Sequence, residues 1–117
     1  MPGDSAKFQT FMNQGHSAAW DQDWDKAVEF YSQALEETPD QPTALASLGL
    51  AHFQLKQYDE ALRVYQRVSA LQPDDPMPFE KIARIYERTG LMNEAVQSFM
   101  QGAEMQLKAH DVDRAVD

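Results

Sequence analysis

The chain has 117 residues, of which 43% are hydrophobic, and it carries a formal net charge of −9. This hydrophobic share suits one folded domain with a continuous core, and it is higher than disordered chains carry. The negative charge argues against binding to nucleic acid or to anionic membranes. The absence of cysteine excludes disulfides and thiolate chemistry.

No apolar run approaches the length of a membrane span, so we expect no membrane partner. The first ten residues, MPGDSAKFQT, lack the basic segment followed by an apolar one that marks a secretory signal. Cytoplasmic is therefore the expected location.

The N-terminal half predicts four helices. We expect residues 1–6 to be disordered, with Asp4 or Ser5 capping a helix that ends near Trp20. After a short turn, Asp23 is expected to cap a second helix over residues 24–37. Pro42 suits the first position of a third helix, because the missing N–H would be unpaired there. The third and fourth helices are expected at residues 42–55 and 58–71.

The C-terminal half begins with the same cap-then-proline pattern at Asp74-Asp75-Pro76. A helix is expected from there to about Thr89, where Gly90 ends it in a left-handed turn. No breaker separates Asn93 from His110, which predicts one long helix. Residues 113–116 then look like the start of another helix, so the long helix could close one unit and open the next.

Residues of the same kind recur every 34 positions, and such a period identifies a repeat architecture. Small residues in a fixed slot let two helices approach closely, a large ring in another slot fills the groove between them, and a proline ends each unit. The recurring positions are Gly15, Gly49 and Ala83; Ala27, Ala61 and Ala95; Tyr31, Tyr65 and Phe99; and Pro39 and Pro73.

This pattern resembles the tetratricopeptide repeat (TPR), and the middle copy matches the consensus at Leu48-Gly49, Phe53, Tyr58, Ala61, Tyr65 and Pro73. The resemblance implies an all-α, right-handed superhelical stack of antiparallel helix pairs. We expect repeat 1 at residues 7–40, repeat 2 at 41–74 and repeat 3 at 75–109. Residues 110–117 are expected to begin a further helix or to form a capping stub.

No constellation of residues predicts catalysis or a metal centre. Asp21, Asp23 and Asp25 begin like a calcium loop, but Lys26 and Ser32 stand where that loop needs glycine and glutamate. The three histidines lie in separate units, and the five glycines are isolated. We therefore expect no enzyme activity, no cofactor and no metal.

In the TPR family the first helix of each unit lines a concave groove that binds peptides. The matching slots hold Met12, Asn13, His16 and Trp20 in the first unit; Ser47, Leu50, Phe53 and Gln54 in the second; and Lys81, Arg84 and Arg88 in the third. By this resemblance the groove is apolar over two units and basic over the third. Five positions depart from the subset that clamps a peptide's terminal carboxylate: Met12, His16, Ser47, Met77 and Lys81, of which only Lys81 is partly suitable.

The resemblance implies a non-catalytic scaffold that binds a protein or peptide segment, with an acidic stretch of the ligand near the basic side chains. Two alternatives stay open. The chain could associate with itself through exposed end repeats, since uncapped repeats leave an apolar face. It could also be the interaction segment of a larger regulatory protein or enzyme that continues past residue 117.

Overall fold

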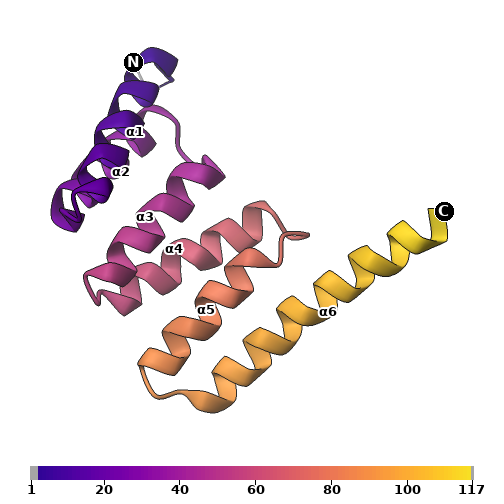
Figure 1. Cartoon of the computed structure of the whole chain (residues 1–117). Coiled ribbons are helices and arrows are strands. Elements are labelled where there is room, and N and C mark those ends of the chain that lie inside the picture. Colours follow the sequence, from indigo (N-terminus) through magenta and orange to yellow (C-terminus); the bar gives the residue numbers. More distant parts are fainter. Residues whose placement is uncertain (1–2, 117) are drawn as a thin grey trace.

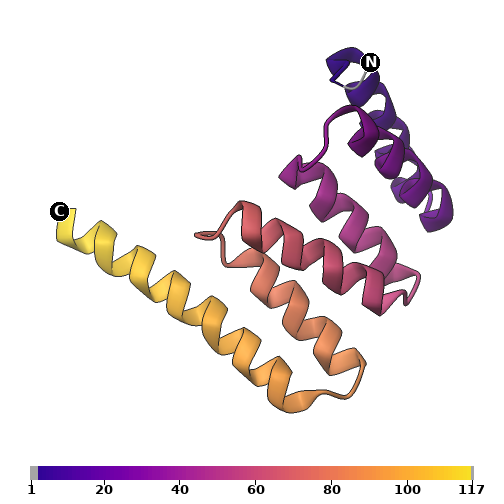
Figure 2. The ribbon, with the colours of Figure 1, turned by 180° about the vertical axis from the view of Figure 1, so that it is seen from behind.

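The computed structural model describes residues 3–116, with side-chain surroundings through residue 110, and this part of the chain consists of six helices and their turns (Figure 1). They are α1 (Ser5–Trp20), α2 (Trp24–Glu37), α3 (Pro42–Gln54), α4 (Tyr58–Leu71), α5 (Met77–Arg88) and α6 (Met92–Val116). Each helix packs chiefly against the helix before it and the helix after it. The six helices therefore form a stack of three antiparallel pairs, which both views show (Figures 1 and 2).

Most helix ends follow the capping chemistry of the sequence. The carboxylates of Asp4 and Asp23 accept hydrogen bonds from the third residue beyond them, as N-caps do. Gln41 does the same for α3 through its side-chain oxygen, which lies 2.8 Å from the Ala44 nitrogen. Asp75, two residues before the first residue of α5, accepts a hydrogen bond from the Met77 nitrogen at 2.9 Å.

Two expectations about the chain ends need correction. Helix α1 already includes Ser5 and Ala6, which we expected to be disordered, because the Asp4 cap starts the helix there. The backbone of Gly3 also bonds to the carbonyl of Glu37, which ties this end to α2. At the other end α6 continues without a break to Val116, so no separate helix begins near residue 113.

The turn inside each pair uses a left-handed residue at the same repeat position. Gln22, Lys56 and Gly90 have φ angles of 61°, 61° and 82°. Only the third unit places glycine there, although a side chain disfavours this conformation. The turns thus have one geometry in all three units, and two of them carry it at a steric cost.

The core forms where the small slots meet the large rings. Ala27 and Ala61 are 0% exposed, and Tyr31 and Tyr65 are 3% and 2% exposed. A Cβ built on Gly49 would lie 2.9 Å from the Tyr65 ring, so only glycine lets α3 and α4 approach this closely. The expected slots therefore hold the pairs together.

Candidate functional site

Side chains of α3, α4 and α5 surround a cavity of about 150 Å³ between the second and third pairs. Helix α3 contributes Leu50, Phe53 and Gln54, while α5 contributes Lys81 and Arg84. Tyr65 of α4 also lines the cavity, and its ring packs against Gly49 of α3. Five of the eleven groove residues named from the sequence thus meet around one hollow.

The apolar side of this cavity is held in place by aromatic contacts. The Phe53 and Tyr58 rings meet edge to face, with centroids 5.6 Å apart and an interplanar angle of 70°. Phe53 also packs against the core cluster that contains Ala61 and Ile82. Leu50 is 38% exposed and so presents apolar surface beside the ring.

The basic side is formed by α5. The Arg88 guanidinium lies 5.6 Å from the centroid of the Phe53 ring, a cation–π contact across the two pairs. The Arg84 Nη2 atom lies 3.3 Å from Glu80 Oε1, and both side chains are about half exposed. Such an exposed pair contributes little to stability, so Arg84 can exchange Glu80 for a ligand carboxylate at small cost.

Burial raises the pKa of the Tyr65 hydroxyl to about 12, so this group stays protonated and neutral under the cavity. Burial also raises the pKa of Tyr31, and an interaction with Ser47 opposes that shift. The Tyr31 hydroxyl lies 2.8 Å from His16 Nδ1. One groove position, His16, is thus held by a core tyrosine.

The first unit contributes less accessible surface than the resemblance implies. Met12 is 3% exposed because its long side chain packs into the core between α1 and α2, which leaves a ligand almost nothing to contact. The Asn13 side chain accepts a hydrogen bond from Gln9. Trp20 is 89% exposed, so it makes no inter-repeat packing contact, and it does not line the cavity.

Among residues 3–110, no group of three His, Cys, Asp or Glu side chains is arranged to hold a metal ion. Within the described residues, no helix combines the length and hydrophobicity that a membrane crossing requires.

Comparisons with known proteins agree with this architecture. Residues 21–85 match a family model described as tetratricopeptide repeat, and residues 79–108 match a second model with the same description. The small glutamine-rich tetratricopeptide repeat-containing protein 2 of Mycosarcoma maydis is 26% identical over 102 residues, which cover 87% of this chain and 29% of that protein. The tetratricopeptide repeat protein 13 of Homo sapiens is 33% identical over 91 residues, which cover 74% of this chain and 11% of that protein. The chain therefore spans less than a third of the length of these relatives.

Solved structures show the same fold. A crystal structure of MamA superposes with a TM-score of 0.85 at 21% identity, covering 92% of this chain and 59% of that one. The Sgt2 TPR domain from Aspergillus fumigatus gives a TM-score of 0.78 at 18% identity, covering 90% of this chain and 68% of that one. A chain of the CopN–Scc3 complex gives 0.79 at 22% identity, covering 91% of this chain and 67% of that one. At these identities the likeness establishes the right-handed superhelical stack of helix pairs.

Proposed function

Because the chain belongs to the tetratricopeptide repeat family, we propose that it is a non-catalytic interaction module that binds a protein segment between α3 and α5. The observation that carries this proposal is the cavity with an apolar wall, Leu50 and Phe53, and a basic wall, Lys81 and Arg84. An apolar patch from which water is excluded is where such interfaces concentrate their binding energy.

The chemistry of the two walls describes the ligand. Apolar side chains of the bound segment contact Leu50 and Phe53, and the cavity of about 150 Å³ holds one such side chain rather than a whole molecule. A carboxylate of the same segment binds Lys81 and Arg84, where guanidinium and ammonium groups donate charge-assisted hydrogen bonds. The ligand is therefore a peptide in which an apolar residue stands close to an acidic one.

Reversal of the charge at Arg84 tests the binding mode. A library of fluorescent peptides that pair leucine or phenylalanine with aspartate or glutamate serves as the probe. For the tightest peptide, Arg84→Glu should weaken binding by about 1 to 3 kcal/mol, because one charge-assisted contact is replaced by repulsion. Binding should also depend less on salt afterwards.

Arg63→Glu is the matched control, since it makes the same charge change on α4 at a side chain that is 71% exposed and outside the cavity. Circular dichroism shows whether both variants keep their helices. If Arg84→Glu keeps its helicity and binds every peptide as the parent chain does, the ligand site lies on another face.

A second function, self-association, is favoured by a separate observation. Several apolar side chains of α6 are 38–62% exposed, and they include Val96, Phe99 and Leu107. In a longer stack of repeats, the next helix pair would cover side chains of this kind. Exposed apolar surface of this kind marks interaction sites.

A further inference from the structure

Exposed apolar side chains follow one face of α6 from Met92 to Leu107. We call this face the α6 stripe: Met92, Val96, Phe99, Met100, Ala103 and Leu107. At 3.6 residues per turn these six positions fall within about 100° around the helix axis. The face that packs on α5 is a different one, since Ala95, Ser98 and Gly102 are the buried residues.

The spacing of the stripe is symmetric about the midpoint between Phe99 and Met100. When two copies of one helix lie antiparallel on a two-fold axis, residue i of one meets residue j of the other, and j meets i. With the axis at this midpoint, Met92 faces Leu107 of the second copy, Val96 faces Ala103, and Phe99 faces Met100. Each large side chain of the stripe thus meets an apolar side chain of the second copy.

A head-to-tail arrangement is disfavoured by the other end of the stack. The first helices of the second and third pairs, α3 and α5, pack on the preceding pair through apolar, buried side chains. These are Ala44, Leu48 and Ala51 on α3, and Pro78, Ile82 and Ile85 on α5. The same slots on α1 hold Thr10, Gln14 and Ser17, which are exposed. Seating α1 of one copy on the stripe of another would remove the Gln14 amide and the Ser17 hydroxyl from water, and the apolar stripe offers them no hydrogen-bond partner.

Charge also favours a second copy. Seven acidic residues crowd the first unit of a chain whose net charge is −9: Asp21, Asp23, Asp25, Glu29, Glu36, Glu37 and Asp40. Between residues 92 and 110, by contrast, α6 carries only Glu94, Glu104 and Lys108. The two α6 helices can therefore meet with little repulsion between them.

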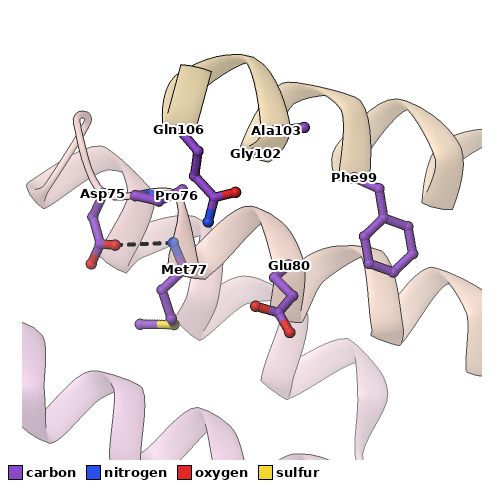
Figure 3. A pocket seen from close by; sticks show the side chains of 8 residues that line it. All are labelled: Asp75, Pro76, Met77, Glu80, Phe99, Gly102, Ala103 and Gln106. Atoms are coloured by element: carbon purple, nitrogen blue, oxygen red, sulfur yellow. Dashed lines mark hydrogen bonds between the residues drawn. The ribbon is translucent and has the colours of Figure 1, made fainter. Parts of the chain in front are cut away.

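A hollow of about 400 Å³ along one edge of the stripe provides room for the partner's side chains (Figure 3). Phe99 and Gln106 extend from α6 on either side of Gly102 and Ala103, and Met77 and Glu80 of α5 lie opposite (Figure 3). Val96 of a second copy would enter this hollow, because it lies opposite Ala103.

We propose that the α6 stripe is the interface of a two-fold symmetric dimer, in which the α6 helices of two copies pair antiparallel about an axis between Phe99 and Met100. This inference rests on the second function, self-association, and is independent of ligand binding between α3 and α5.

Sedimentation equilibrium over a dilution series tests the interface. The molar mass should rise to that of a dimer, and Val96→Glu should raise the dissociation constant by at least about tenfold, because it buries an unpaired charge. Gln97→Glu is the matched control, since it adds the same charge next to Val96 but on the exposed polar side, and it should leave the mass profile unchanged. A parent chain that stays monomeric at every concentration overturns both the interface and the second function. A dimer that Val96→Glu leaves intact overturns the interface alone.

Cysteine crosslinking tests the register, and the natural chain offers no competing thiol. Residue 100 lies next to the axis. Under mild oxidation the Met100→Cys variant should therefore form a disulfide between the two copies of this residue in the dimer. Two copies of residue 92 would lie about 22 Å apart along the helices, too far for a disulfide. Met92→Cys should therefore crosslink only when it is mixed with Leu107→Cys. Crosslinking of Met92→Cys with itself would overturn the antiparallel register even if the dimer stands.

Discussion

Gly49 and Gly102 both lie inside helices, but their surroundings differ. A Cβ added to Gly49 would lie 2.9 Å from the buried Tyr65 ring, whereas one added to Gly102 would meet Phe79 and Pro76 at 3.5 and 3.6 Å. The first distance forces a buried ring to move, and the second two are ordinary contacts. The two glycines therefore have different reasons to be there.

Substitution by alanine should consequently have opposite signs at the two sites. Gly49→Ala should lower the free energy of unfolding by about 1 to 3 kcal/mol, because overpacking outweighs the gain in helix propensity. Gly102→Ala should raise it by about 0.5 to 1 kcal/mol, since the propensity gain acts alone. Urea unfolding at low protein concentration measures both. If both substitutions changed the free energy of unfolding in the same direction, the close contact between Gly49 and the Tyr65 ring would be contradicted.

Tyr65 also predicts a pH dependence of stability. Its pKa of about 12 in the folded chain lies above the ordinary value of 10.0, so the folded state holds the proton more tightly than the unfolded state does. This stabilisation is fully present below pH 10 and is lost as the pH rises toward 12. We expect a loss of about 2 to 3 kcal/mol across that range from this group.

Tyr65→Phe removes the titrating hydroxyl and sacrifices only a long hydrogen bond to the Ala46 carbonyl, at 3.5 Å. Urea unfolding of both proteins between about pH 9 and 11.5 isolates the effect of this group, because the two proteins differ in no other ionisable side chain. Parallel profiles for the two proteins would show that Tyr65 is not the cause.

At single residues the sequence predicted the structural slots better than the groove. The 34-residue period was sufficient to identify Gly49 and Tyr65 as packing positions, because the packing of a ring on a glycine depends only on repeat position. The same period placed Phe99 in the slot of Tyr65, yet Phe99 is 38% exposed, because among the described helices only α5 packs on α6. Met12 was assigned to the groove by slot number, but its length lets it fill the core instead.

At the scale of elements, the helix starts were predictable because their caps are local. Asp23 and Pro42 act as expected from the sequence. The left-handed turns at Gln22 and Lys56 were not foreseen, since neither residue favours positive φ. Repeat geometry imposes that conformation, so only an alignment of each turn with Gly90 could have indicated it.

The crossing of α3 and α4 makes a prediction about Ala61, which is fully buried there. Ala61→Leu should lower the free energy of unfolding by about 1 to 3 kcal/mol, because the crossing has no room for three more carbons. Ala70→Leu introduces the same atoms on the exposed side of α4 and should change the value by less than about 0.5 kcal/mol. Equal melting temperatures for Ala61→Leu and the parent chain would contradict the packing of this pair.

At the scale of the whole molecule, the stack is a linear array that measures 43 × 38 × 23 Å, with contacts mainly between successive helices. Its acidic residues are concentrated in the first unit, while Lys81, Arg84 and Arg88 lie in the third. The sequence shows this separation of charge directly. The sequence does not show which basic side chains line the same cavity. This depends on how closely α3 and α5 approach each other, which only the structure shows.

This separation predicts how an acidic peptide approaches the cavity. At about 0.01 M salt, electrostatic fields extend roughly 30 Å, comparable with the size of the molecule, so the acidic unit opposes association. The triple variant Asp21→Asn, Glu29→Gln and Glu36→Gln removes three exposed negative charges. It should raise the association rate constant of the tightest acidic peptide by a factor of about two to five at that salt concentration. Asp23 is left unchanged because it caps α2.

Stopped-flow fluorescence measures the association rate, and the dissociation rate should stay the same because none of the three residues lines the cavity. The same measurement at about 0.5 M salt is the control, since screening over a few ångströms should remove the difference. An unchanged association rate at low salt would place the peptide far from the field of the first unit. A change confined to dissociation would instead mean that these side chains contact the bound peptide, and that the ligand site extends onto α1 and α2.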